Sequence, residues 1–210
     1  MDLNKIHCGD ALDLFPKLDH KPNLIIMSPP DLAETPFSFE EYREFLKKAY
    51  KLASDSLSDT GILASITTDR KMNRTIYSKH IDIINATPMT LFNHKIWAKN
   101  LKCNLFIQTF SHALFFRKGV KATNNKLVDF LPDVWLIPVD KTSWYPTKDS
   151  FPTELVRRII LNCSNENDVV LDPFMGSGKT ARVCISNKRN FIGFELDTNM
   201  VDLATKHLND

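Results

Sequence analysis

A glycine-rich turn between an apolar run and a helical stretch carries the clearest chemical signal in the sequence. Residues 169–180 read VVLDPFMGSGKT. The glycines at 176 and 178 permit a tight turn and bring backbone amides close to a ligand at the start of the following helix. The end of this stretch is similar to a P-loop, but a P-loop requires glycine where this chain has Pro173. An NTPase is therefore a distant alternative, and a turn that binds no ligand is another.

A carboxylate at the end of the next apolar run adds a second feature to this turn. Residues 190–195 read NFIGFE, so Glu195 closes an expected strand. In dinucleotide-binding folds an acidic residue at such a place accepts hydrogen bonds from ribose hydroxyls. The turn and Glu195 together predict a site for a nucleoside-bearing cofactor in a Rossmann-like sheet.

A second loop with chemical potential follows an earlier apolar run and reads Ser28-Pro29-Pro30-Asp31. Two consecutive prolines fix φ near about −65° and remove two N–H donors. Their carbonyl groups are then presented rigidly beside the Ser28 hydroxyl, which also accepts hydrogen bonds. Such a cluster of acceptors is suited to gripping an amino group, although a plain strand-ending turn explains the same letters.

Five short apolar runs predict the buried strands that position these loops. They cover residues 4–8, 23–28, 61–67, 168–172 and 190–195. Ser38 and Glu41 form a capping-box pattern, after which apolar residues recur at helical spacing as far as Ala53. A second helical stretch covers residues 180–187. Strands that alternate with helices predict an α/β fold whose parallel sheet is covered on both faces.

The composition is that of one soluble globular domain. The chain has 210 residues, 43% of them hydrophobic and 25% charged, with a formal net charge of +2. Its four cysteines are far apart and form no C-x-x-C pair. We therefore expect reduced thiols in a cytoplasmic protein, with neither a metal site nor a disulfide framework. No apolar run approaches the ~20 residues needed to cross a bilayer, so no membrane association is expected.

Positive charge is concentrated in the middle of the chain. Residues 70–126 contain eleven basic residues and one acidic residue, a net charge of +10, whereas the remainder has 16 basic and 24 acidic residues, or −8. A solvated face is the ordinary reason for a charged run. A bias of this size, interleaved with aromatic residues, favours instead a surface that contacts the phosphate backbone of DNA.

The catalytic and cofactor signals, in this order, resemble a known family: the S-adenosylmethionine-dependent DNA amino-methyltransferases of the permuted (beta) class. In that class the catalytic motif precedes the cofactor motif, as Ser28–Pro30 precedes residues 172–178 here. The resemblance extends over most of the chain. Similar segments are IHCGDA at 6–11, FNHKIWAKN at 92–100, HALFFRK at 112–118, DVW at 133–135 and FPTEL at 151–155.

The resemblance implies a fold and a division of the chain. The expected fold is α/β and Rossmann-like, with a seven-stranded, mainly parallel sheet and helices on both faces. One antiparallel strand is expected near residues 105–117, and the N- and C-terminal strands are expected side by side at the centre. The chain is expected to be a single domain, 1–210. Its catalytic half would cover about 1–118, a short recognition insert about 119–132, and a cofactor-binding half about 133–210.

The resemblance also assigns the site. S-adenosyl-L-methionine is the implied cofactor, and its expected binding residues are Asp10, Phe151, Asp172, Phe174, Gly176, Ser177, Gly178 and Glu195. The expected catalytic residues are Ser28, Pro29, Pro30 and Asp31. A base of double-stranded DNA would be flipped into their pocket, where the Ser28 hydroxyl and the Pro29 carbonyl hold its exocyclic amine. No metal is expected in this scheme.

The residue that opens the catalytic loop bears on the target base. Ser at this position is typical of cytosine-N4 enzymes of the family, so Ser28 favours methylation of cytosine N4. Asp or Asn there is typical of adenine-N6 enzymes, which stay the near alternative. Because the insert offers little surface for reading bases, we expect a short recognition sequence, loose specificity or the help of a homodimer partner.

Two positions depart from the pattern of the family. Its catalytic loop ends in an aromatic residue that stacks on the flipped base, whereas this chain has Asp31. Loss of such a stack costs about 1–3 kcal/mol, so a catalytically silent, DNA-binding relative is a further alternative. Asp31 is also a candidate acceptor for the proton released after transfer. The second departure is Lys179, where the family usually has Thr.

Overall fold

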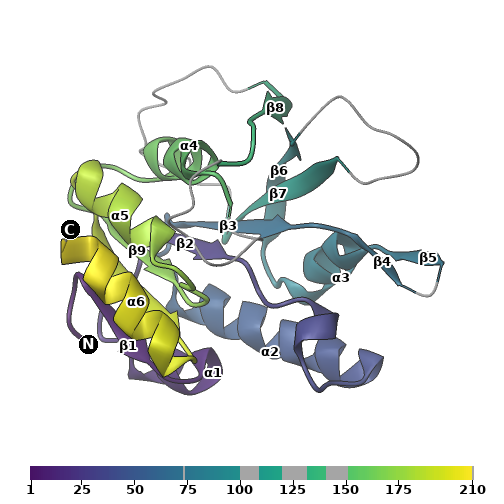
Figure 1. Cartoon of the computed structure of the whole chain (residues 1–210), viewed down its shortest axis with the longest axis horizontal. Helices are drawn as coiled ribbons and strands as arrows, with labels where there is room; N and C mark the ends of the chain where they lie inside the picture. Colours follow the sequence, from purple (N-terminus) through teal and green to yellow (C-terminus); the bar gives the residue numbers. More distant parts are fainter. Residues whose placement is uncertain (73, 100–108, 120–131, 141–150, 210) are drawn as a thin grey trace.

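The computed structural model describes residues 1–72, 74–99, 109–119, 132–140 and 151–209, and one sheet runs through them (Figure 1). Its strand order is β1-β10-β9-β2-β3-β7-β6-β8. The strands are β1 Lys5–Cys8, β2 Leu24–Met27, β3 Ile62–Thr67, β6 Thr90–Ala98, β7 Phe110–Arg117, β8 Val134–Leu136, β9 Val169–Asp172 and β10 Asn190–Glu195. β7 is antiparallel to both of its neighbours, and the other neighbouring pairs are parallel.

This topology confirms the predicted α/β fold with one reversed strand. The expected antiparallel segment, 105–117, contains β7, and its residues 105–108 lie outside the described part. A separate hairpin is formed by β4 Arg70–Met72 and β5 Thr75–Tyr77. β2 and β3 are buried along their whole length, as strands covered on both faces are.

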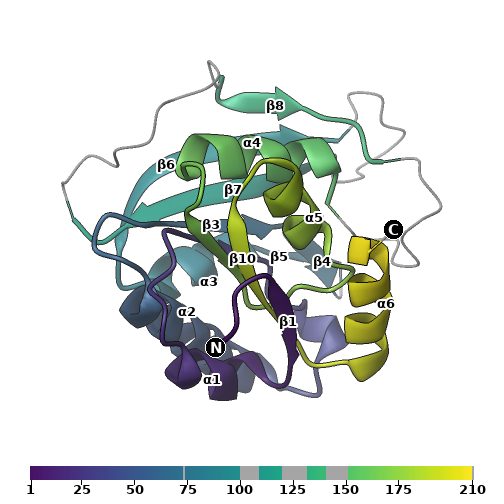
Figure 2. The same cartoon turned by 90° about the vertical axis from the view of Figure 1, so that its left-hand side faces the viewer.

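Helices cover both faces of the sheet (Figures 1 and 2). One face packs against α1 Ala11–Leu14, α2 Phe39–Ser56 and α3 Lys79–Ala86, together with the short 3-10 helices η1 Phe15–Lys17 and η2 Leu32–Glu34. The other face packs against α4 Thr153–Cys163, α5 Lys179–Ser186 and α6 Thr198–Asn209. Two separate apolar clusters therefore form the core, one on each side of the sheet. Among the described helices, none combines the length and the apolar character that a membrane span requires.

Helix α2 begins where the capping-box pattern predicts. The Ser38 hydroxyl accepts a hydrogen bond from the Glu41 amide at 3.3 Å, and the Glu41 carboxylate accepts one from the Ser38 amide at 2.7 Å. The apolar face of α2 is buried against the sheet, and the hydroxyl groups of Tyr50 and Ser65 on β3 lie 2.5 Å apart. The helix is thus fixed at its start and in its middle.

Two expectations about the sheet need correction. The described residues hold eight strands in the main sheet rather than seven, because Val134–Leu136 pairs with the outer edge of β6. The N- and C-terminal strands are neighbours, as expected, but they are not central: β1 is an edge strand, and β10 lies between it and β9. Figure 2 shows β1 and β8 at opposite ends of the sheet. In this order β9 lies beside β2, and β9 leads into the glycine-rich turn.

Candidate active site

The carboxyl ends of three neighbouring parallel strands bring the predicted chemical segments together. β9, β2 and β3 are adjacent and parallel. The glycine-rich turn follows β9, the Ser28–Pro30 segment follows β2, and Thr67 ends β3. Segments that follow parallel strands meet at one edge, which is where open α/β sheets bind ligands. Two adjacent cavities lie at this edge.

The first cavity, of about 180 Å³, lies against the glycine-rich turn. Gly176 and Gly178 adopt φ of 54° and 80°, in the left-handed region that favours glycine. Gly178 also passes close to α6, where a Cβ on it would lie 2.9 Å from the Ala204 Cβ. Five of the predicted cofactor residues line this cavity: Phe151, Asp172, Phe174, Gly176 and Ser177.

Asp172 connects the two ends of the glycine-rich turn. Its Oδ1 accepts a hydrogen bond from the Phe174 amide at 3.0 Å, and its Oδ2 accepts one from the Thr180 hydroxyl at 2.6 Å. Burial raises the pKa of Asp172 to about 6, although both hydrogen bonds favour the charged form. The side chain therefore holds the turn together, but at neutral pH its buried, ionised form lowers the stability of the fold.

We expect the substitution Asp172→Asn to remove part of the pH dependence of stability. Aspartate ordinarily titrates near 3.8 and Asp172 near 6, so between these values the folded state binds more protons and the wild type loses stability as the pH rises. A shift of about two pH units corresponds to about 3 kcal/mol. Urea unfolding of both cofactor-free proteins between about pH 4 and pH 7 measures the difference, and identical pH profiles would contradict the assignment.

The remaining three predicted cofactor residues are not among those that line the first cavity. Gly178 begins α5. The Glu195 carboxylate accepts hydrogen bonds from the amides of Gly176 at 2.8 Å and Asp197 at 2.9 Å. Asp10 caps α1 by accepting from the Leu12 amide at 2.8 Å. Cys8 and Glu195 are partners in the β1–β10 register, so the loops that carry Asp10 and Glu195 leave the sheet side by side. Their contact with a cofactor stays a prediction.

The second cavity, of about 200 Å³, adjoins the first. Ser28, Ile66 and Phe151 line both cavities. The predicted catalytic residues Ser28, Pro29, Pro30 and Asp31 all line the second one. The others that line it are Glu34, Thr67, Thr68, Arg70, Lys79, Trp97, Lys99 and Val139. Ser28 is thus in the wall that the two cavities share, together with Ile66 and Phe151.

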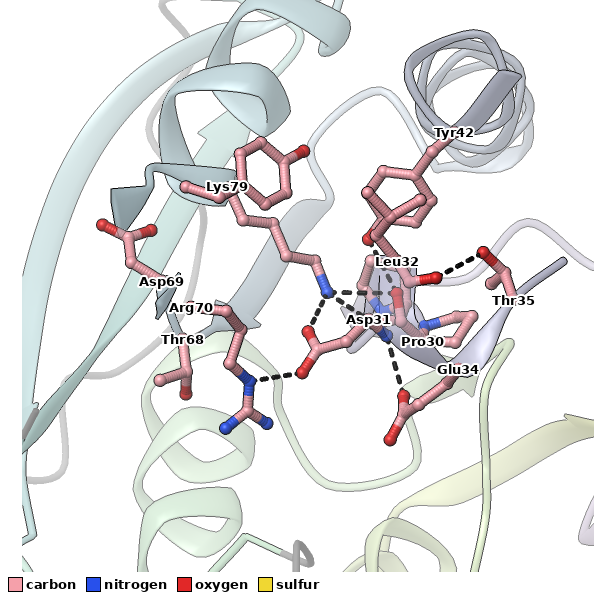
Figure 3. Close-up of polar contacts among 12 residues, drawn as sticks. Pro30, Asp31, Leu32, Glu34, Thr35, Tyr42, Thr68, Asp69, Arg70 and Lys79 are labelled. Atoms are coloured by element: carbon pink, nitrogen blue, oxygen red, sulfur yellow. Dashed lines mark hydrogen bonds and ion pairs between the residues drawn. The ribbon is translucent and has the colours of Figure 1, made fainter. Parts of the chain in front are cut away.

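Asp31 is held between two basic side chains (Figure 3). Its Oδ1 accepts a hydrogen bond from Lys79 Nζ at 2.8 Å, and its Oδ2 accepts one from Arg70 Nε at 2.5 Å. Burial alone would raise the pKa of Asp31, but Lys79 and Arg70 outweigh it and hold the pKa below its ordinary value. A carboxylate with a lowered pKa binds a proton weakly, which argues against Asp31 as the acceptor of the released proton.

Lys79 also holds the carbonyl groups of the two prolines. It is 2% exposed, and its Nζ donates to the carbonyl oxygens of Pro29 at 2.8 Å and Pro30 at 3.2 Å. The Tyr42 hydroxyl donates to the Pro30 carbonyl at 2.7 Å. The Pro29 carbonyl, expected to hold the target amine, therefore already accepts one hydrogen bond. A carbonyl oxygen has two lone pairs, so it can accept a second one.

The expectation that the basic residues of 70–126 form a surface for the phosphate backbone does not hold for two of them. Lys79 and Lys95 are both buried. Lys95 Nζ donates to the Asp133 carboxylate at 2.7 Å, as Lys79 does to Asp31. The acidic partners lie outside the basic segment in the sequence, so a count of charges within it misses them. Lys102, Lys121 and Lys126 lie outside the described residues, as does most of the expected recognition insert.

Sequence reasoning also missed how Phe151 is placed between the cavities. Lys179 is 5% exposed, and its Nζ donates to the Phe151 carbonyl at 2.5 Å and to Asp140 Oδ2 at 2.9 Å. The same Asp140 oxygen accepts hydrogen bonds from the amide and hydroxyl of Thr153, both at 2.9 Å. Lys179, one of the two departures from the family, therefore links the segment before α4 to the start of α5, next to the glycine-rich turn.

A buried hydroxyl in the second cavity is a further residue that the sequence did not signal. Thr67 Oγ1 has no hydrogen-bond partner among the described residues, although Thr67 is only 2% exposed. Buried polar groups are nearly always hydrogen-bonded. An unpaired hydroxyl in the wall of a cavity is therefore available to a polar ligand.

Comparison with known proteins agrees with this geometry. The family model described as DNA methylase matches residues 23–206. Type II methyltransferase M2.LlaDCHI of Lactococcus lactis subsp. cremoris is 31% identical over 192 residues, covering 82% of this chain and 69% of that protein. The PvuII DNA methyltransferase (cytosine-N4-specific) shares the fold, with a TM-score of 0.82, 16% identity and coverage of 95% of this chain and 84% of that one. The M1.HpyAVI–SAM complex has a TM-score of 0.74 and 25% identity, covering 98% and 99% of the two chains.

Proposed function

The chain belongs to the S-adenosylmethionine-dependent DNA amino-methyltransferases, and we propose that within this family it methylates the exocyclic N4 of cytosine in double-stranded DNA. The observation that carries the proposal is the pair of cavities with Ser28 in their common wall. Methyl transfer requires a donor and an acceptor held in contact, in a fixed orientation. Two adjoining cavities at the carboxyl edge of the sheet supply that arrangement.

The first cavity fits the cofactor. Gly176 lines it, and a Cβ on Gly176 would meet no atom closer than the Phe174 carbonyl oxygen at 4.0 Å. A side chain there would project into open space beside the turn, which glycine leaves to a ligand. When bound, S-adenosylmethionine supplies an electrophilic methyl group on its sulfonium. The turn and the start of α5 would hold it from one side, and Phe151 would orient it toward Ser28.

The second cavity fits an amino-bearing base. The Ser28 hydroxyl and the free lone pair of the Pro29 carbonyl accept hydrogens of the target amine and turn its nitrogen lone pair toward the first cavity. Lys79 and Tyr42 fix the two proline carbonyls, so the acceptors keep their places during transfer. The unpaired Thr67 hydroxyl offers one more contact to a polar edge of the base. Orientation and preorganised hydrogen bonds would then supply most of the rate.

Ser28 supports cytosine as the target. A hydroxyl both donates and accepts, whereas the carboxylate or amide typical of adenine-N6 relatives makes a different set of hydrogen bonds. Adenine N6 is the nearest alternative, because both bases carry the same exocyclic amine. The contribution of a second copy of the chain to recognition stays a prediction.

Mass spectrometry of the methylated product tests the choice of base. The protein is incubated with S-adenosylmethionine and mixed-sequence duplex DNA, which is then digested to nucleosides. We expect N4-methylcytosine, at a rate that Ser28→Ala lowers by about 100-fold through loss of a positioning contact. N6-methyladenine instead would overturn the cytosine assignment. Neither product, with the cofactor still bound, would favour the silent DNA-binding relative.

A further inference from the structure

A cluster of histidines and a carboxylate lies directly behind the second cavity. Asp69 follows β3, His80 is in the first turn of α3, and His112 is on β7. One ligand atom from each of these three residues lies within 4.8 Å of the other two. Asp69 stands between Thr68 and Arg70, which line the second cavity, and Figure 3 shows its carboxylate pointing away from Asp31. The proposed methyl transfer uses none of the three side chains.

One nitrogen in this cluster has no hydrogen bond. His112 is 5% exposed, and its Nε2 is buried without a hydrogen-bond partner in the described part of the chain. Asp69 Oδ2 lies 3.5 Å from this nitrogen but does not form a hydrogen bond with it. A buried nitrogen left in this way costs about 1–3 kcal/mol. A ligand between His112 and Asp69 would remove that cost.

Within the described ranges, the buried carboxylate of Asp69 has no lysine or arginine as an ion-pair partner. Among the described residues its ion pairs are with His80 Nδ1 at 2.8 Å and His112 Nε2 at 3.5 Å, and neighbouring Arg70 pairs with Asp31 instead. Asp69 is 6% exposed. Buried charged side chains are ordinarily paired or coordinate a metal, so a bound cation would supply the partner for this carboxylate.

The other nitrogen of His112 has the support that a metal ligand needs. Its Nδ1 lies 3.0 Å from Nε2 of His94 on β6. Metal-binding histidines commonly donate their second N–H to an acceptor, usually a carboxylate, a backbone carbonyl or water, which fixes the ring and the tautomer. When His112 donates its Nδ1–H to His94, its Nε2 carries the lone pair of the ring, 3.5 Å from Asp69 Oδ2.

The rings of His80 and His112 set one requirement for binding. Their centroids lie 4.0 Å apart and their planes are 15° from parallel. A metal ion in the plane of both rings requires one ring to turn. The His80 side chain is 21% exposed and that of His112 is 7% exposed, so His80 is the ring with room to move.

We propose that Asp69, His80 and His112 bind one divalent transition-metal ion, with zinc as the best match, and that His94 supports the site from behind. Two imidazoles and a carboxylate suit zinc and its first-row neighbours, whereas calcium and magnesium prefer oxygen ligands alone. Asp69 and His80 directly adjoin Arg70 and Lys79, which hold Asp31. The ion would therefore link β3, α3 and β7 behind the catalytic loop. It would also fix the positions of Arg70 and Lys79, the two basic residues that bind Asp31.

Metal titration of the full chain tests the site without any need for methyl transfer. Protein stripped of metal is titrated with Zn²⁺ by calorimetry, and its thermal unfolding is followed with and without Zn²⁺. We expect one ion per chain and a higher unfolding temperature with Zn²⁺. His112→Asn and Asp69→Asn should each weaken binding by at least about 100-fold, and His94→Gln by about 10-fold. The matched variant His20→Asn, which removes an exposed histidine outside the cluster, should bind Zn²⁺ as the wild type does.

The outcomes separate this proposal from the proposed function. Absence of Zn²⁺ binding by the wild type, or binding that His112→Asn leaves unchanged, would overturn the metal site whether or not the protein methylates DNA. If His112→Asn does not fold, the visible spectrum of the wild type with Co²⁺ decides. Intense four- or five-coordinate bands would support the site, and the weak spectrum of hydrated Co²⁺ would refute it.

Discussion

Replacement of Lys79 by Met is expected to lower the free energy of unfolding by about 3 kcal/mol and the rate of methylation by about 100-fold. Lys79 Nζ donates to the carbonyls of Pro29 and Pro30 and to the Asp31 carboxylate. Removal of one member of a buried ion pair leaves the other without its partner, which costs about 3–5 kcal/mol. The lower end applies here because Arg70 still binds Asp31. The loss of rate follows from displacement of the catalytic loop, since a small misplacement of acceptors costs about 100-fold.

A double-mutant cycle tests whether the effect of Lys79→Met depends on the Asp31 carboxylate. Urea unfolding and initial methylation rates are measured for the wild type, Lys79→Met, Asp31→Asn and the double variant. The double variant should recover part of the stability lost in Lys79→Met, because it contains no unpaired carboxylate. Lys47→Met is the matched control: Lys47 pairs on the surface with Glu44, and its loss should change stability by less than about 1 kcal/mol. If the stability changes of the two single variants simply add in the double variant, Lys79 and Asp31 do not interact, which would contradict the proposed ion pair.

Gly176→Val is expected to weaken the binding of S-adenosylmethionine by at least about 100-fold, or roughly 3 kcal/mol. Gly176 has a φ of 54°, which a β-branched residue adopts only with strain. Its side chain would also project beside the first cavity, where the nearest contact of an added Cβ is the Phe174 carbonyl oxygen at 4.0 Å. Calorimetric titration with the cofactor measures the change in affinity.

Gly119→Val is the control for this substitution. A Cβ on Gly119 would meet no atom of the described residues within 4 Å, and Gly119 is not among the residues that line the first cavity. This variant should bind the cofactor as the wild type does. Unchanged affinity in Gly176→Val, in a protein that unfolds cooperatively, would mean that the cofactor does not lie against the glycine-rich turn.

The strands and the two signature loops were predictable because their signals are local. β2, β3, β9 and β10 each begin within one residue of an expected apolar run. Ser38 and Glu41 marked the start of α2 through a hydrogen-bond pattern that spans four residues. The two loops were also expected to lie close together, because the carboxyl ends of parallel strands meet at the same edge of a sheet.

The ion pairs of Asp31 with Arg70 and Lys79 could not be predicted from the sequence, because they join elements that are distant in the chain. Arg70 and Lys79 are 39 and 48 positions from Asp31 in the chain. Lysine is ordinarily exposed, so a basic run suggests a surface. Lys79 is instead buried, and its Nζ donates to three acceptors. β8 escaped prediction for another reason: three residues are too few to show a period.

Transfer of a labelled methyl group from S-adenosylmethionine to duplex DNA is measured for the purified wild type, Gly176→Val and Ser28→Ala. We expect label in DNA for the wild type, loss of label with weakened cofactor binding for Gly176→Val, and loss of label with unchanged cofactor binding for Ser28→Ala. Cofactor binding by the wild type without label in any DNA would contradict the proposed methyl transfer. The two cavities would then bind without catalysing transfer.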